Sequence, residues 1–569
     1  MALENHIPPA SSGEPYRYEE LSDFTGGLNL RADQTSLGDN ESPALLNVEV
    51  DPRGGIARRD AIDALNATAL GEILKISSHH ETTGDNQILV AAKDSSNTAL
   101  YYGSGGNFTR INTSASGSGV ALAGHALPGF VTFNDETYIS NGSLFETDKS
   151  AVKWTGANSA SVLTPDIDGT AGHFPLARLM CTWGERVWVA STRESATNHF
   201  NRIRWSKVDK GDEWNADDYI DIDVGEHGDH ITAIVPNGDR LLVFKENAIY
   251  GVYGFDSDSF QVINLTRIAG SIDDCTPVAS PLGVFFWYAQ EGVYMLGAES
   301  LDYMFHSIKP AITRSQLTFT GVPSLMWFDN RLWVSVDYQS GDGIQNSNQT
   351  NRRNVFVYDP SLSMNGSWTR FDINARNLFT YKPPGGTHLG LCATSDVDSG
   401  VTTAAFTRVC KVNIDADMDD YTGAPSNTQI HSFYQTRWLE GNRPTFGKRW
   451  GKTRTVLLAD NTISVQMKIY KDYNTASEAV TLSQQITGEA STSAWDSATW
   501  QKLPGDEGTD GNGVWVSFGD SQIYKFFKWP SAGTAKAISI RFNVDPSTDN
   551  NGKWGCTSIV GMYRTRRIR

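Results

Sequence analysis

The densest group of side chains that could do chemistry lies between residues 217 and 230. It combines the pair His227 and His230 with the carboxylates Asp217, Asp218, Asp221, Asp223, Glu226 and Asp229. Carboxylates and imidazoles at this density could bind a divalent metal. However, the central aspartates alternate with apolar residues, as on a strand with one wet face, and a loop does not align two histidines as a helix would. We therefore expect no metal, and we interpret residues 217–229, the acidic segment, as a hydrated face turned toward a channel or a partner.

The stretch just before it, residues 206–214, resembles the Asp-box hairpin of sialidase-type propellers. It carries one extra residue between Ser206 and Asp209. In an Asp-box the aspartate ties the loop backbone and the tryptophan, here Trp214, packs beneath it. We therefore predict a structural turn in this stretch, without a role in catalysis.

Other patterns that would indicate an enzyme are missing from the sequence. It contains no serine nucleophile elbow, phosphate-binding glycine loop or Cys–His signature. A carboxylate pair for glycosidic cleavage would have to come from distant segments, and nothing marks one. The five cysteines are scattered without a CxxC pair, which predicts reduced core thiols: Cys181, Cys275, Cys392, Cys410 and Cys556. We expect no catalytic residues, no cofactor and no enzymatic activity.

Composition and charge predict a folded, acidic protein of several domains. The chain has 569 residues, 39% of them hydrophobic and 20% charged, with a net charge of −17. Such a surface repels nucleic acid and anionic membrane, which argues against a groove-reading DNA-binding protein. We find no apolar run of about 18 residues and no apolar segment near the first residue, so we expect neither a membrane span nor a signal peptide.

The elements that would position these residues form a repeat. Residues 184–190, 238–245 and 282–288 are apolar strands that each follow or include a turn and precede a second strand. They begin roughly 45 to 55 residues apart, the spacing of four-stranded propeller blades. Further candidate blades are residues 71–112, 125–163 and 321–375, and residues 376–420 would complete the ring or lead out of it.

We therefore predict an all-β protein with three parts. Residues 1–65 are an extended N-terminal arm and docking segment, residues 66–420 a β-propeller-like body, and residues 421–569 a β-sandwich-like domain. Within the first part we expect a short helical turn over residues 41–47. A hairpin should follow, with strands at residues 48–50 and 56–58 around the glycines Gly54 and Gly55.

Spaced motifs in the N-terminal half resemble one family. Residues 24–29 read Phe-Thr-Gly-Gly-Leu-Asn, residues 37–41 Leu-Gly-Asp-Asn-Glu and residues 54–59 Gly-Gly-Ile-Ala-Arg-Arg. Residues 240–245 add Arg-Leu-Leu-Val-Phe-Lys. Together they resemble the tail nozzle proteins of tailed bacteriophages, also called tail hub or tail tubular protein B-like proteins, chiefly those of short-tailed phages.

The resemblance implies a structural protein of the virion tail. It implies a homo-oligomeric ring, a hexamer, below the portal and the head-to-tail adaptor, with other tail proteins or tail fibres as neighbours. The ring would enclose the DNA channel and gate genome ejection, with viral double-stranded DNA passing without specific binding. The resemblance places candidate adaptor or subunit contacts at Phe24, Gly26, Gly27, Leu28 and Asn29. The acidic segment is then the candidate channel-facing surface.

Two other interpretations stay open. The imperfect Asp-box and the 16 tryptophans would also suit a propeller that binds or cleaves glycans in receptor recognition. Alternatively, the chain could form a ring elsewhere in the tail or baseplate of a longer-tailed virus.

Overall fold

The computed structural model describes residues 16–565 with internal gaps. The gaps are 113–120, 125–126, 143–150, 195–196, 225–228, 290, 299, 315–321, 338–352, 363–365, 396–405, 417, 422–427, 442–444, 460–462, 476, 487–524 and 545–552. Residues 1–15 of the N-terminal arm, together with Glu226 and His227, therefore lie outside the described residues. Nearly all regular secondary structure in the described part is strand, and its one helix is α1 (Lys309–Arg314).

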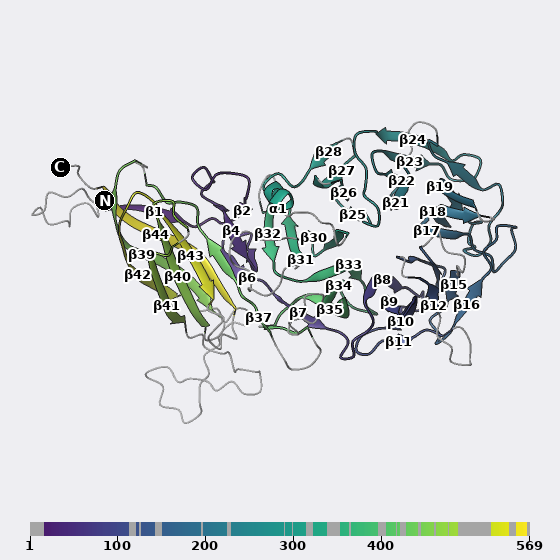
Figure 1. The fold of residues 1–569 in the computed structure, drawn as a ribbon, viewed down its shortest axis with the longest axis horizontal. Helices are drawn as coiled ribbons and strands as arrows, with labels where there is room; N and C mark the ends of the chain where they lie inside the picture. Colours follow the sequence, from purple (N-terminus) through teal and green to yellow (C-terminus); the bar gives the residue numbers. More distant parts are fainter. Residues whose placement is uncertain are drawn as a thin grey trace, which may run out of the picture.

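Seven sheets in the described residues form the blades of a propeller, and their pairing is antiparallel except where β2 (Gly27–Leu28) joins blade 6 (Figure 1). Blades 1 to 3 are β8 (Ile73–His79), β9 (Gln87–Asp94), β10 (Asn97–Gly103), β11 (Thr109–Arg110) and β12 (Ala121–Ala123); β13 (Gly129–Phe133), β14 (Glu136–Ser140), β15 (Ala151–Trp154) and β16 (Ala160–Leu163); β17 (Leu176–Trp183), β18 (Arg186–Glu194), β19 (Thr197–Trp205) and β20 (Tyr219–Asp221). Blades 4 and 5 are β21 (Ile231–Asn237), β22 (Arg240–Lys245), β23 (Ile249–Tyr253) and β24 (Gln261–Thr266); β25 (Val278–Ser280), β26 (Gly283–Tyr288), β27 (Gly292–Leu296) and β28 (Leu301–Tyr303).

Blades 6 and 7 include strands from the N-terminal segment. They are β29 (Ser324–Phe328), β30 (Arg331–Asp337), β31 (Arg353–Asp359) and β32 (Ser367–Phe371), extended by β2 (Gly27–Leu28) and β3 (Glu41–Ser42); and β33 (Ala375–Tyr381), β34 (Leu389–Ser395), β35 (Phe406–Ile414) and β7 (Ala61–Ala64). Each innermost strand contacts the innermost strand of the next blade, and β33 contacts β8. The ring is therefore closed, and its last outer strand comes from the N-terminal segment.

Tight turns connect the first two strands of several blades. The pairs Asn134–Asp135, Gly184–Glu185 and Asp329–Asn330 all have φ values between 51° and 62°. Two successive residues with positive φ are typical of the type I′ turn, whose twist matches that of the flanking strands. The repeated Gly, Asp and Asn residues that mark the blades in the sequence are thus explained by the backbone they adopt.

A second body, a β-sandwich, lies beside blades 5 and 6 (Figure 1). One sheet contains β42 (Lys525–Ala535), β39 (Lys448–Ala459), β44 (Trp554–Thr565), β6 (Ile56–Arg58), β5 (Val48–Val50) and β1 (Arg17–Leu21). The other contains β4 (Ala44–Leu46), β38 (Phe433–Gln435), β43 (Ile538–Val544), β40 (Ile463–Lys471) and β41 (Val480–Ile486). A small bridge of β36 (Met418–Asp419) and β37 (Thr428–Gln429) lies between the two bodies in the sequence. The predicted all-β class, with a propeller body and a C-terminal sandwich, is confirmed.

The N-terminal segment contributes strands to both the propeller and the sandwich. β1, β4, β5 and β6 belong to the sandwich, whereas β2, β3 and β7 belong to blades 6 and 7. The predicted hairpin of residues 48–58 is confirmed, with Val50 opposite Ile56. The helical turn predicted over residues 41–47 is wrong, because residues 44–46 pair with β38 instead. Asn47 then turns the chain with a φ of 52° and donates its amide to the carbonyl oxygen of His431 at 2.7 Å.

One apolar core joins the sandwich to the propeller. Buried side chains of this core come from the N-terminal segment, blades 5 and 6 and both sandwich sheets; examples are Phe24, Trp287, Phe356, Trp450 and Phe542. A shared core resists movement of one body against the other, because separating them would expose apolar surface. Among the described residues, no helix has the length and apolar character needed to span a bilayer.

Candidate functional site

The structure divides the acidic segment between two places. Asp217 and Asp221 are exposed at the outer edge of blade 3, in or next to β20, and Asp218 is half-buried there. Asp223 and Asp229 instead approach Lys245, which is fully buried at the end of β22. The distance from Lys245 Nζ is 3.1 Å to the carbonyl oxygen of Asp223 and 3.9 Å to Oδ1 of Asp229.

At the outer edge, arginines already engage part of the charge. Arg202 binds both carboxylate oxygens of Asp221, at 2.7 and 2.8 Å, and this contact lowers the pKa of Asp221. Arg202 and Arg204 both bind Glu194 at 3.0 Å, and both guanidinium groups lie over the ring of Tyr219. Asp217 is therefore the residue at this edge that best fits the predicted hydrated face, whereas the half-buried Asp218 accepts a hydrogen bond from Asn215 at 2.7 Å.

The Asp-box-like stretch is a structural turn between β19 and β20. Trp214 is fully buried against Phe174, and its indole N–H donates to the carbonyl oxygen of Gly211 at 3.1 Å. The Ser206 hydroxyl accepts the backbone N–H of Val187 at 3.0 Å. These contacts fix the loop against blades 2 and 3, as the sequence predicted.

A cavity lies at the centre of the propeller in the described part of the chain. Its volume is about 1070 Å³, and residues from all seven innermost strands line it. On its wall, Arg178 of β17 binds Asp274 at 2.6 Å and Asp273 at 3.1 Å. His230, just before β21, is 2.7 Å from Asp273, and this hydrogen bond raises the pKa of the imidazole. These residues form an ion cluster that connects blades 3 and 4 with the segment leading into blade 5.

Lys75 of β8 faces the same cavity from blade 1. Within the part of the chain that the structure describes, its amine makes no hydrogen bond or ion pair. Burial lowers the pKa of Lys75, although the nearby carboxylate of Asp274 acts in the opposite direction. Arg376 of β33, which also lines the cavity, is in contrast 3.5 Å from Glu72.

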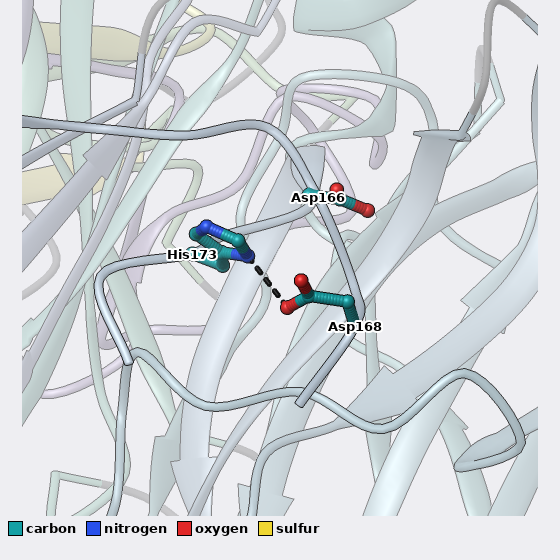
Figure 2. Close-up of side chains that lie close together, drawn as sticks. All are labelled: Asp166, Asp168 and His173. Carbon is teal, nitrogen blue, oxygen red and sulfur yellow. Dashed lines mark hydrogen bonds and ion pairs between the residues drawn. The ribbon is translucent and has the colours of Figure 1, made fainter. Parts of the chain in front are cut away.

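Three further residues come close enough to hold a metal ion (Figure 2). Asp166, Asp168 and His173 lie in the loop between β16 and β17, with candidate ligand atoms within 4.8 Å of one another. The loop's own hydrogen bonds account for this arrangement. Asp168 accepts the backbone N–H of Thr170 at 2.9 Å, which lowers its pKa, and it pairs with His173 Nδ1 at 2.7 Å. These side chains thus stabilise the conformation of the loop between β16 and β17.

Most of the residues predicted to contact the adaptor are buried against other parts of this same chain. Phe24 and Leu28 are buried in the shared core, and Phe24 packs edge-on against Tyr434. Gly27 is also buried and pairs with Trp368 of β32. Gly26 and Asn29 are half-buried, and the Asn29 amide donates to Glu41 at 2.9 Å. These residues therefore hold the propeller and sandwich together, and contact with an adaptor stays a prediction for the segment.

Sequence reasoning missed the ion cluster beside the cavity, and it missed Lys75 on the cavity wall. Lys75, Arg178, His230 and Asp273 belong to different blades and lie up to almost 200 residues apart in the sequence, so no local spacing connects them. The available signal was a charged residue inside an apolar innermost strand, such as Lys75 between Ile73 and Ile76.

Comparison with known proteins yields only distant matches of fold. No protein-family model matches the chain, and no curated protein matches it in sequence. YCF48 from Cyanidioschyzon merolae is 9% identical with a TM-score of 0.37, over 62% of this chain and 99% of that one. The WD40 domain of Pan2 from Neurospora crassa is 10% identical with a TM-score of 0.34, over 65% of this chain and 98% of that one. The propeller assignment therefore depends on the sheet order and the closed ring of innermost strands.

Proposed function

We propose that this protein is a structural subunit of a tailed-bacteriophage tail, forming a ring below the head-to-tail adaptor. The observation that carries the proposal is the position of the residues that resemble tail nozzle proteins. Residues 24–29 and 54–59 are the ones that bind the propeller and sandwich into one body. A sequence motif whose residues join two folded bodies is better suited to a structural protein of a ring wall than to an enzyme.

Mechanical rigidity supports this proposal. The N-terminal segment contributes strands to both bodies, and Arg59 forms a buried ion pair with Asp419 at 2.6 Å. A ring that contains DNA under pressure must resist bending between its parts. A shared core and strand exchange provide this, because bending would break several sheets at once.

Electrostatics supports the passage of DNA. A net charge of −17 gives a surface that does not retain a phosphate backbone. We assign the channel-facing role to the outer-edge part of the acidic segment, the exposed Asp217 and the half-buried Asp218, in a hexameric ring. The protein acts in the virion tail without catalysis, and its neighbours are the adaptor and other tail proteins or fibres.

The test is the mass of the purified full chain in solution, alone and mixed with virion tail components, followed by negative-stain imaging. A ring with a central channel, formed alone or on docking, is the expected result. A chain that stays monomeric in both conditions and ignores tail components would overturn the proposal.

The central cavity favours a second candidate, a glycan-binding or glycan-cleaving propeller. Its volume suits a small ligand, and Glu72, Glu246 and Asp274 lie on its wall. However, Glu72 and Asp274 are already engaged by arginines. Release of reducing ends from host polysaccharide, abolished by Glu246→Gln, would favour this candidate over the nozzle.

A further inference from the structure

Two of the five cysteines are brought together in the blade that closes the ring. Cys392 of β34 and Cys410 of β35 are direct partners across the antiparallel ladder. Both side chains are fully buried in one apolar cluster with residues such as Ile62, Trp333 and Phe371. Cys181, Cys275 and Cys556 lie in other parts of the fold.

The ladder geometry suits a covalent bond between these two thiols. Direct partners in an antiparallel pair point to the same face, with Cα atoms about 4.5 or about 5.5 Å apart. Both separations lie within the range of about 4.4 to 6.8 Å that disulfides span. The Cys410 Sγ now lies 3.0 Å from the Thr394 hydroxyl, on the same face and two residues beyond Cys392. Rotation of side chains, without movement of strands, would bring the sulfurs together.

We propose that Cys392 and Cys410 form an oxidisable dithiol, which a small peroxide converts into a cross-strand disulfide. In the first step the Cys410 sulfur attacks hydrogen peroxide, the O–O bond breaks, and a sulfenic acid and one water form. In the second step the Cys392 sulfur attacks the sulfenic sulfur and displaces a second water. Two thiols lose two electrons and two protons in total, and the peroxide is reduced to two waters.

Local chemistry sets the order and the speed of the two steps. Burial raises the pKa of Cys410 to about 12, and the hydrogen bond from Thr394 limits that rise. Burial raises the pKa of Cys392 as well, and the neighbouring Cys410 adds to the shift. Since the thiolate is the reactive form, the first step is slow at neutral pH and begins at Cys410. Thr394→Val should therefore slow oxidation without changing its product.

The disulfide would stabilise blade 7, the blade that closes the propeller ring. Cys410 is also the partner of Ala64 in β7, the strand that the N-terminal segment contributes to blade 7. Tying β34 to β35 constrains the unfolded chain and holds the sheet on which β7 docks. We expect the melting temperature of the oxidised protein to rise by roughly 2 to 3 °C. This inference concerns the single chain and does not depend on the proposed ring.

The experiment treats the folded wild-type chain with hydrogen peroxide at pH 8.5, using a phosphine-reduced sample as reference. Thiols are then counted after denaturation, and the five of the reduced chain should fall to three. Trypsin cleavage after Arg408 separates the two cysteines, so a disulfide appears as two linked peptides in the mass spectrum. The linked pair should vanish on reduction.

Matched variants decide the assignment. Cys275→Ala also removes a buried thiol, but it should leave the linked peptides and the loss of two thiols unchanged. Cys410→Ala should abolish both. A count of five thiols in oxidised folded wild type, or a link that forms only in unfolded chain, would overturn the proposal. A link between any other pair of cysteines would overturn it too.

Discussion

At the scale of single residues, the chain uses ion pairs mainly to hold segments that are distant in sequence. Arg59 and Asp419 are 360 residues apart, and their side chains are only 2% and 4% exposed. Asp419 also accepts the backbone N–H of Ile62, at 3.1 Å, just as the chain enters β7. One carboxylate therefore anchors the N-terminal segment to the end of the propeller.

Removing one partner of this pair should destabilise the protein strongly. Asp419→Asn leaves the Arg59 guanidinium buried without a counter-charge, and we expect a loss of about 3 to 5 kcal/mol in the free energy of unfolding. Denaturant unfolding followed by tryptophan fluorescence measures it. Asp94→Asn breaks the exposed pair with Arg110, 2.8 Å apart, and should cost at most about 1 kcal/mol. Equal losses in the two variants would contradict the structure.

The His230–Asp273 contact beside the cavity should make stability depend on pH. Its hydrogen bond raises the folded-state pKa of His230 above the ordinary value of 6.5. The stabilisation is therefore fully present below pH 6.5 and disappears as the pH rises through the higher folded-state pKa. Arg178 opposes the shift, Glu246 supports it, and the Phe200 ring lies beside the imidazole.

We expect the melting temperature to fall between about pH 6 and pH 8, and this fall to be smaller in His230→Gln. Melting curves of both proteins across this range provide the measurement. His388→Gln, at an exposed position, should keep the wild-type profile. If His230→Gln keeps it as well, the contact does not have the predicted effect.

At the scale of elements, the two-residue strand β2 shows how closely the N-terminal segment fits against blade 6. Gly27 has a φ of 62°, and a Cβ atom built there would lie 2.1 Å from Ser367 Oγ and 2.6 Å from the Trp368 carbonyl oxygen. This position has no room for a side chain. Its positive φ also lies outside the region that residues other than glycine usually adopt. The Gly-Gly pair in the motif is thus required by close approach of two strands.

Gly27→Ala should therefore lower the free energy of unfolding by more than about 2 kcal/mol, from backbone strain plus the clash. Gly238→Ala is the matched control, since Gly238 has a φ of 64° and nothing within 4 Å of the added Cβ. Gly238→Ala should lose only the free energy that comes from backbone strain, about 1 kcal/mol. Denaturant unfolding of both variants tests the difference, and similar losses would count against tight packing at Gly27.

At the scale of the whole molecule, the chain is an elongated unit with the sandwich at one end and the outer blades at the other (Figure 1). Blades 2 to 4 lie far from the sandwich, and blade 3 carries the exposed part of the acidic segment. In the proposed ring, the orientation of this elongated unit decides which surface meets the DNA.

Reversing the charge of Asp217 and Asp218 to lysine should slow genome ejection, because a cationic surface in the channel would retain the phosphate backbone. The measurement is DNA release from virions that carry the double variant. The same reversal at Asp256 and Asp258, exposed in blade 4, is the control and should have a smaller effect. If the Asp217/Asp218 double variant ejects DNA at the wild-type rate, the acidic segment does not line the channel.

The sequence by itself determined the all-β class, the repeat of the blades and their turns. These features depend on local physics: apolar alternation along a strand, and turn residues that tolerate positive φ. The pairs at positions 184–185 and 329–330 predict their turns regardless of what lies elsewhere in the chain.

Only the tertiary structure decided which strands pair across long distances. The helical turn expected at residues 41–47 was wrong because pairing with β38, almost 400 residues away, outweighs local propensity. The same holds for β7, which pairs with β35 in blade 7, and for the ion cluster beside the central cavity. Each depends on a register summed over many weak contacts, and no short window of sequence contains both partners.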